Sequence, residues 1–298
     1  YIMIPITDKI KFIEGKNQGR YIFSNSLYID DDLKAIIDTG TGKSPLRKLK
    51  KNYVGNDEIL IINSNVHEDH ICGNYIFKNS KIALHRIEVP ILENIDRLAE
   101  LYGIDDPKYK EMNEQFFAIF NLRNYKADIK IEDNHIFDLG EIKLQTIHAP
   151  GHCAGHCMFW ESNNKILFLA DIDLSSFGPW YGDISSSVTD FINSINKAIK
   201  LNPDIAISSH KGVYKEEIRE KLKIFLDKIY DREEKILNFL DKKHTLEEIV
   251  NKAFIYGKFP EPEEMFAIAE RIMVKLHINR LLDAKKIEEN PKSSFFAI

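Results

Sequence analysis

The feature that most constrains this chain is a repeated placement, in which side chains that can bind a metal follow directly after short apolar runs. The clearest case is the segment 65–70, Asn-Val-His-Glu-Asp-His, which follows the apolar run 59–62. Strands provide a rigid platform, and the loops at their ends leave the backbone free to aim ligands at one point. The segment therefore predicts one half of a metal site, with the other half further along the chain.

Three later segments repeat this placement and can supply the other half. His152 lies in a Gly-His pair, Asp171 follows the apolar run 166–170, and His210 ends the run that begins at 205. Imidazole and carboxylate ligands together suit zinc, manganese or iron, whereas calcium and magnesium prefer nearly all-oxygen shells. We expect these side chains to converge at one sheet edge and to bind zinc, with iron as the second expectation and manganese also allowed.

The order of these residues resembles the pattern of the metallo-β-lactamase superfamily, which runs His-x-His-x-Asp-His, then Gly-His, then Asp, then a last His. The resemblance covers the first two thirds of the chain and implies an α/β fold, a four-layer αββα sandwich. It also implies two metal positions, with His67 and His152 at the first, Asp69, His70 and His210 at the second, and Asp171 bridging both.

One position departs from that pattern, because Asn65 stands where the family carries its first histidine. An amide oxygen is a weaker zinc ligand than an imidazole nitrogen and favours harder ions. Three alternatives stay open: a mononuclear enzyme, an enzyme that fills the first position only with substrate present, and a different metal preference. We therefore expect one or two ions and keep Asn65 among the candidate ligands.

Further residues are expected to support this site or to line it. Asp38, in an Asp-Thr-Gly turn that also resembles the superfamily, is expected to hold Asn65 or a neighbouring backbone group in place. His156 is expected to support the site or pack beside it rather than bind the metal. A loop after Asp171 is expected to line a substrate pocket, because large aromatic side chains beside a metal are costly to expose otherwise. Its aromatic residues are Phe177, Trp180 and Tyr181.

Hydrophobic periodicity divides the chain into two expected domains. Residues 1–214 form the catalytic domain, which begins with short strands that include 19–23. A helical insert at about 89–124 falls between the first two ligand loops, where it could form a lid or a wall of the substrate site. Residues 215–298 form a helical domain, which resembles the winged-helix-like tail of some superfamily members, including a group with ribonuclease activity.

Composition narrows the expected partners. The formal net charge is −5, and from Lys215 onward 17 Lys and Arg stand against 17 Asp and Glu, so the basic excess typical of nucleic-acid binding is not obvious. The apolar runs are far shorter than the ~20 residues needed to cross a bilayer. The three cysteines suit a reducing cytosol better than a disulfide framework. We expect a cytoplasmic protein with a small-molecule substrate and no membrane partner. Nucleic acid is less favoured, and a homodimer is allowed.

The expected reaction is hydrolysis by a metal-activated water, which Asp69 can orient, on a small ester, thioester or lactone. One alternative is a metal-dependent endoribonuclease, suggested by the C-terminal tail. Another is a mononuclear iron enzyme similar to persulfide dioxygenases, suggested by Asn65 and the imidazoles of the metal loop. Hydrolysis of β-lactams is not expected, because the helical insert and the added domain differ from the compact secreted enzymes.

Overall fold

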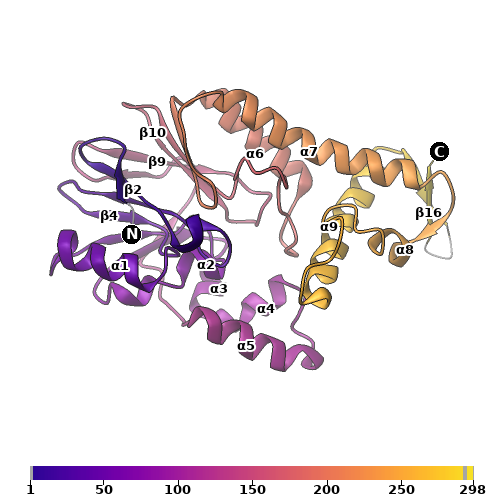
Figure 1. Ribbon diagram of the computed structural model, residues 1–298, viewed down its shortest axis with the longest axis horizontal. Helices are drawn as coiled ribbons and strands as arrows, with labels where there is room; N and C mark the ends of the chain where they lie inside the picture. Colours follow the sequence, from indigo (N-terminus) through magenta and orange to yellow (C-terminus); the bar gives the residue numbers. More distant parts are fainter. Residues whose placement is uncertain (1–2, 291–293, 298) are drawn as a thin grey trace.

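The computed structural model of the chain describes residues 3–290 and 294–297. Two β-sheets pack face to face, helices cover their outer faces, and a smaller C-terminal lobe lies at one end of the molecule (Figure 1). This is the four-layer αββα sandwich with a helical C-terminal region, so the predicted fold class is confirmed.

Within the described residues, the strands form three sheets. The first follows chain order: β1 (Met3–Pro5), β2 (Ile10–Ile13), β3 (Ser26–Ile29), β4 (Ala35–Ile37), β5 (Leu60–Ile62), β6 (Lys81–His85) and β7 (Ile129–Ile131). The second has the order β13-β12-β11-β10-β9-β8: β8 (Ile136–Asp138), β9 (Lys143–His148), β10 (Cys157–Glu161), β11 (Ile166–Ala170), β12 (Ile205–Ser208) and β13 (Gly212–Tyr214). The third lies in the C-terminal lobe and has the order β14-β16-β15: β14 (His244–Thr245), β15 (Ile287–Glu289) and β16 (Ser294–Ala297).

The helices that surround these sheets are mostly short in the first part of the chain and long in the last. The α-helices are α1 (Lys43–Leu49), α2 (Glu68–Ile71), α3 (Val89–Glu93), α4 (Leu98–Leu101), α5 (Lys110–Phe120), α6 (Val188–Leu201), α7 (Ile218–Phe239), α8 (Leu246–Val250) and α9 (Glu263–Asp283). Single turns of other helix types are η1 (Lys16–Gly19), η2 (Lys50–Val54), η3 (Asn74–Ile76), η4 (Ile95–Arg97) and η5 (Pro107–Tyr109).

The central strands are apolar along their whole length because both faces of each sheet are buried. Successive side chains of a strand point to opposite faces. In β5, Leu60 and Ile62 join the core between the two sheets, whereas Ile61 joins the core under the outer helices. In β11, Phe168 faces the other sheet and Leu167 faces α6 and α7. Continuous apolar runs are therefore what this layered arrangement requires.

The C-terminal lobe, formed by the C-terminal half of α7 and the described residues after it, shares a hydrophobic core with the second sheet. Helix α7 packs along α6 and continues into the lobe, and α9 contacts both (Figure 1). Phe191 of α6, Phe225 of α7 and Met273 of α9 belong to one buried cluster. Across the molecule, Met265 and Ile268 of α9 pack against the cluster that contains the insert helices α3–α5. The lobe thus contacts both halves of the sandwich.

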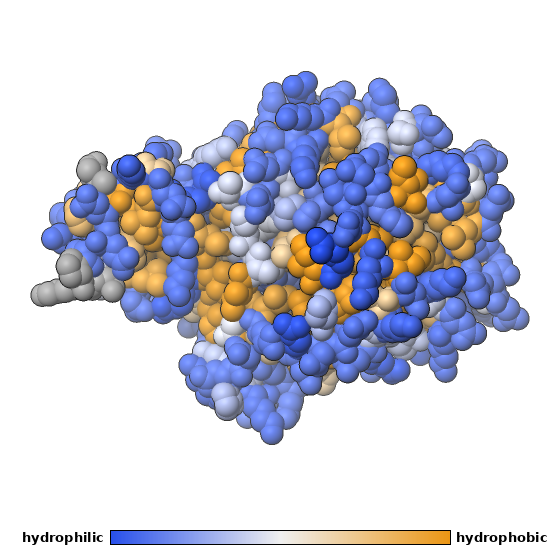
Figure 2. Space-filling view, turned by 180° about the vertical axis from the view of Figure 1, so that it is seen from behind, coloured by the Kyte–Doolittle hydropathy of each residue, from blue (hydrophilic) through white to orange (hydrophobic). Residues whose placement is uncertain are grey.

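The molecular surface mixes hydrophilic and hydrophobic areas. Figure 2 shows hydrophobic side chains along the middle of the face seen from behind, bordered by hydrophilic ones. Among the described residues, no helix combines the length and the hydropathy that a membrane span requires.

The strand predicted at residues 19–23 is wrong. The structure has the single turn η1 there, followed by an irregular loop, and Gly19 adopts a left-handed backbone with φ of 69°. The physical reason is a competing set of contacts, because the carbonyl oxygens of Gly19 and Phe23 both accept hydrogen bonds from the His210 ring. In a strand these two carbonyl oxygens would lie about 13 Å apart, because a strand rises ~3.3 Å per residue, so one nitrogen could not contact both.

Candidate metal centre

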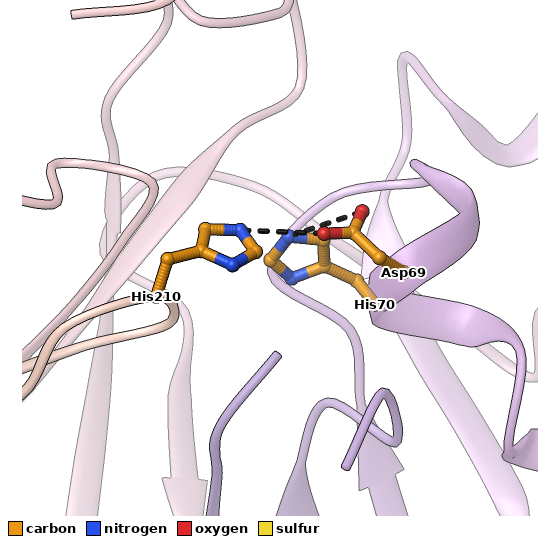
Figure 3. Close-up of side chains that lie close together, drawn as sticks. All are labelled: Asp69, His70 and His210. Atoms are coloured by element: carbon orange, nitrogen blue, oxygen red, sulfur yellow. Dashed lines mark ion pairs between the residues drawn. The ribbon is translucent and has the colours of Figure 1, made fainter. Parts of the chain in front are cut away.

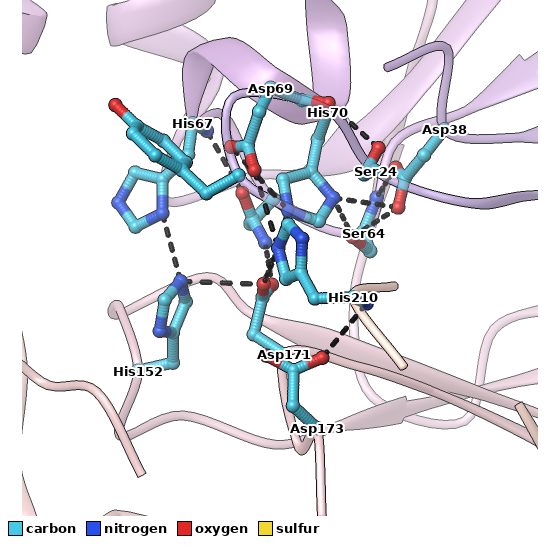
Figure 4. A network of polar contacts seen from close by, with 12 residues as sticks. Ser24, Asp38, Ser64, His67, Asp69, His70, His152, Asp171, Asp173 and His210 are labelled. Carbon is cyan, nitrogen blue, oxygen red and sulfur yellow. Dashed lines mark hydrogen bonds and ion pairs between the residues drawn. The ribbon is translucent and has the colours of Figure 1, made fainter. Parts of the chain in front are cut away.

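The candidate ligands lie where strands of both sheets end. The segment 65–70 follows β5 of the first sheet, while Asp171 and His210 follow β11 and β12 of the second. The parallel pairing of β11 with β12 shifts register between Phe168 and Ala170, and Ala170 has φ of 49°. Such an irregularity re-aims the next side chain. In this case that side chain is Asp171, whose carboxylate points towards His70 and His210 (Figure 4).

The predicted second metal position brings together two imidazoles and two carboxylates. The Nε2 atoms of His70 and His210 each lie 3.2 Å from Asp171 Oδ1. His210 Nε2 also lies 3.3 Å from Asp69 Oδ2, and Figure 3 shows both rings facing the Asp69 carboxylate. One ligand atom from each of Asp69, His70 and His210 lies within 4.8 Å of the others. This nitrogen and oxygen donor set fits zinc, iron or manganese.

The far nitrogens of these two rings are held by acceptors. His70 Nδ1 lies 2.8 Å from Asp38 Oδ2, and His210 Nδ1 lies 2.7 Å from Gly19 O and 3.0 Å from Phe23 O. A carbonyl or carboxylate only accepts, so each Nδ1 carries the proton and, in a neutral ring, Nε2 keeps its lone pair for a metal. Asp38 itself accepts from Ser64 N at 2.8 Å.

The charge balance of this position favours a cation. Burial lowers the pKa of His70, but the carboxylates of Asp171 and Asp38 outweigh it and raise that pKa well above its ordinary value. Burial likewise opposes protonation of His210, yet Asp173 and Asp171 raise its pKa to about 10. Protons therefore neutralise the carboxylates here, and a metal ion that displaced them would do the same.

At the predicted first metal position, two imidazoles converge. His67 Nδ1 lies 2.9 Å from His152 Nε2, while His67 Nε2 contacts Asp183 Oδ2 at 3.0 Å and His152 Nδ1 contacts Trp180 O at 3.0 Å. Their outer nitrogens donate to these acceptors, so two neutral rings would place lone pairs against each other. Burial lowers the pKa of His67, but the hydrogen bond to Asp183 raises it to about 9. The two rings therefore share one proton between His67 Nδ1 and His152 Nε2, and a metal cation could replace that proton.

Asn65 is turned away from this position. Its Nδ2 donates to Asp171 Oδ2 at 2.6 Å, and its Oδ1 accepts from His67 N at 2.9 Å. The Asn65 amide thus forms a hydrogen bond with the Asp171 oxygen that a metal ion at the first position would need as a ligand. His152 Nε2 lies 3.6 Å from the same oxygen. The donor set of the first position is therefore poorer than that of the second.

Asp171 is supported from behind by His156. Its backbone N donates to His156 Nε2 at 3.1 Å, and His156 Nδ1 donates to Ala149 O at 2.9 Å. Both ring nitrogens are thus used within the protein, which agrees with a supporting position for His156. Burial would raise the pKa of Asp171, but His70 and His152 lower it well below its ordinary value, so the carboxylate is ionised.

The three aromatic residues of the predicted pocket loop lie in different surroundings. Trp180 lies beside the first position, with its ring centre 5.4 Å from that of His152 and 6.0 Å from that of His67. Tyr181 is fully buried against the C-terminal lobe, and Phe177 is 38% exposed. A pocket role for Trp180 stays a prediction with a direct geometric basis, whereas Tyr181 faces the protein interior.

The sequence interpretation missed a buried acid beside the site. Glu68 accepts hydrogen bonds from Tyr21 OH at 2.8 Å and from Tyr102 OH at 2.6 Å, and burial raises its pKa. Tyr102 follows α4, so the helical insert does reach the edge of the site. Asp183, the partner of His67, was also missed. Glu68 begins α2 inside the segment 65–70, but its two phenol partners are distant in the chain, and Asp183 lies in a loop that shows no local pattern.

The comparisons with known proteins agree with this geometry. Residues 19–210 match the family described as the metallo-beta-lactamase superfamily. The acyl-coenzyme A thioesterase MBLAC2 of Bos taurus is 24% identical over 183 residues, which are 56% of this chain and 63% of that protein, and the Homo sapiens protein is 23% identical over the same lengths. The chain therefore spans less than two thirds of these curated relatives.

Solved structures show the same fold at low sequence identity. A beta-lactamase domain protein from Burkholderia ambifaria has a TM-score of 0.78 at 14% identity, covering 99% of this chain and 94% of that one. A metallo-beta-lactamase family protein from Thermus thermophilus has a TM-score of 0.68 at 18% identity, covering 92% and 94%. Because the family match spans more than half of the sequence, the chain belongs to the metallo-beta-lactamase superfamily.

Proposed function

We propose that this protein is a metal-dependent hydrolase of thioesters. The observation that carries the proposal is the second metal position, where two imidazole Nε2 atoms and two carboxylates converge while each Nδ1 is held by an acceptor. Family membership supports hydrolysis, and the MBLAC2 relatives, named as acyl-coenzyme A thioesterases, support the thioester. One zinc ion, held by Asp69, His70, His210 and Asp171, is the proposed cofactor.

A bound divalent metal would lower the pKa of water to near ~7 and polarise a carbonyl under attack. The protein's own groups complete the site. Asp69 can accept a hydrogen bond from the attacking water, and the rings of Trp180 and Tyr102 lie beside the His67 ring, 6.0 and 5.6 Å from it between centres. Glu68 already accepts two phenol hydrogen bonds, so we assign it a structural role.

A thioester makes the smallest demand on such a site. Its leaving group is a thiolate with an ordinary pKa of about 8.5, which departs without a strong acid to protonate it. An alkoxide from a simple ester is a far stronger base and needs a positioned proton donor. Around the second position, the side chains are proposed as metal ligands or as partners of those ligands, so none is assigned as a proton donor. A thioester, which needs no such donor, therefore suits the site.

The ribonuclease alternative finds less support in the C-terminal lobe. Three of the four arginines of α7 and α9 contact groups of the protein itself: Arg232 contacts carbonyl oxygens, Arg271 contacts Glu247, and Arg280 contacts Glu233. Phosphate binding needs such cations free and clustered on one face. RNA cleavage is therefore an outcome to be tested rather than the favoured activity.

The test is thiol release from acyl-coenzyme A substrates of increasing chain length, followed with a thiol-reactive chromophore on zinc-loaded protein. His70→Ala is the negative control and Asp128→Asn, far from the site, is the matched positive control. We expect turnover in the wild type and in Asp128→Asn, and none in His70→Ala. Equal background release by all three proteins would refute the proposal, and parallel assays with single-stranded RNA and with oxygen consumption on a persulfide would then test the alternatives.

A further inference from the structure

The loop at residues 177–183 holds the outer nitrogens of both imidazoles at the first metal position. Trp180 O accepts from His152 Nδ1, and Asp183 Oδ2 accepts from His67 Nε2, each at 3.0 Å. The loop therefore determines which nitrogen of each ring faces the site. Whatever fixes this loop also fixes the two rings.

The loop is fixed by the C-terminal lobe, chiefly through Arg232 of α7. The Arg232 side chain donates from Nη1 to Pro179 O at 2.5 Å and from Nη2 to Phe177 O at 2.6 Å. Its Nη1 also donates to Tyr181 OH at 3.0 Å. Arg232 is 4% exposed, and a buried guanidinium is costly unless its donors are satisfied. The planar fork of arginine matches two carbonyls that lie two residues apart in the chain, which a lysine cannot reproduce.

Two further contacts attach the same loop to the lobe. Trp180 Nε1 donates to Tyr256 OH at 2.8 Å, and Tyr181 OH lies 2.8 Å from His277 Nε2 of α9. The loop is thus held from α7, from α9 and from the segment between α8 and α9, and on its opposite side it contacts the two imidazoles.

We propose that Arg232 is a positioning residue for the metal centre and that, through the loop 177–183, it makes the C-terminal lobe a working part of the active centre. The proposal rests on the proposed function only in that His67 and His152 belong to the site. It gives the lobe a role beyond packing, because the lobe holds the residues on either side of Trp180, whose carbonyl oxygen orients His152.

The test compares Arg232→Met and Arg232→Lys with Arg271→Met, a matched arginine of the lobe whose partner is Glu247. The direct readout is the His152 Nδ1–H proton in nitrogen-15 NMR of the zinc-loaded full-length chain, assigned with a His152→Gln variant. We expect this proton to be protected from solvent exchange in the wild type and in Arg271→Met, and unprotected in Arg232→Met. Arg232→Lys should restore protection in part, since lysine can reach one carbonyl.

In the thioester assay, kcat of Arg232→Met should fall on the order of tenfold, because His152, whose Nε2 lies 3.6 Å from the proposed ligand Asp171, loses its orientation, with KM little changed. Wild-type protection of the proton in a folded Arg232→Met protein would overturn the proposal. If that variant does not fold, Arg232→Lys decides, because it keeps the charge but can reach only one of the two carbonyls, and full wild-type protection there would overturn the proposal as well. Loss of protection without any thioester turnover in the wild type would retain the positioning role and refute the proposed function.

Discussion

The substitution Asp38→Asn tests how a metal ligand is oriented without testing the stability of the fold. Asp38 is fully buried, and its backbone has φ of 57°, a left-handed conformation that Asp and Asn tolerate better than other side chains. Ser64 N donates to Oδ1 at 2.8 Å, so the Asn amide oxygen must stay there and the NH₂ group must face His70 Nδ1. The ring proton then moves to Nε2, the atom that faces the metal.

The size of the effect follows from the lost orientation. Removing an acceptor that orients a metal-bound histidine weakens metal binding by about 10- to 100-fold, which corresponds to ~1.4 to ~2.8 kcal/mol of binding free energy. We therefore expect the zinc dissociation constant of Asp38→Asn to rise by this factor in a competition titration against a chromophoric chelator. The control is Asp128→Asn, since Asp128 also accepts a backbone N–H, that of Ile82 at 3.0 Å, but lies away from the site. Wild-type zinc affinity in a folded Asp38→Asn protein would refute the reasoning.

Three further predictions follow from the same contacts. Asn65→His adds a third imidazole to the first position and releases Asp171 Oδ2, so elemental analysis should find metal content rising from about one towards about two equivalents; unchanged content would contradict the role given to Asn65. Asp171→Ala removes the carboxylate that contacts both imidazoles of the second position, so the purified variant should lose most of its metal. Full metal occupancy would contradict the site assignment. Burial and the neighbouring His148 lower the pKa of His85 to about 4. Because this folded-state pKa lies below the unfolded value of about 6.5, the stability contributed is complete above about pH 6.5 and is lost as the pH falls towards 4. Urea midpoints should therefore fall more between about pH 7.5 and about pH 5 in wild type than in His85→Gln, and equal falls would count against this explanation.

The sequence predicted those parts of the structure that depend on neighbouring residues. Apolar runs identified β5, β11 and β12, and the side chains that follow them were expected to converge at one sheet edge because loops at strand ends can aim ligands at one point. The side chains do converge, but from the edges of two facing sheets rather than from one. The partners of those side chains could not be predicted. Asp183 lies 116 residues from His67, and Arg232 lies 53 residues from Pro179. Such contacts depend on how layers pack, and no spacing within one segment encodes them.

The loop at residues 19–23 shows that a distant contact can also override a local prediction. Its apolar and aromatic residues favour a strand by local preference, but two of its carbonyls are needed by His210, which is more than 180 residues away. Local preference is a weak prior that tertiary contacts override.

The placement of the second metal position has a mechanical consequence for the whole sandwich. Asp69 and His70 come from the first sheet, whereas Asp171 and His210 come from the second. An ion bound by all four would cross-link the two sheets at their edge, so part of its binding free energy would resist their separation. Removing the metal should then lower the temperature at which the sheets come apart, besides stopping catalysis. The ion would thus hold the two sheets together, and each sheet would need the ligands of the other to retain the ion.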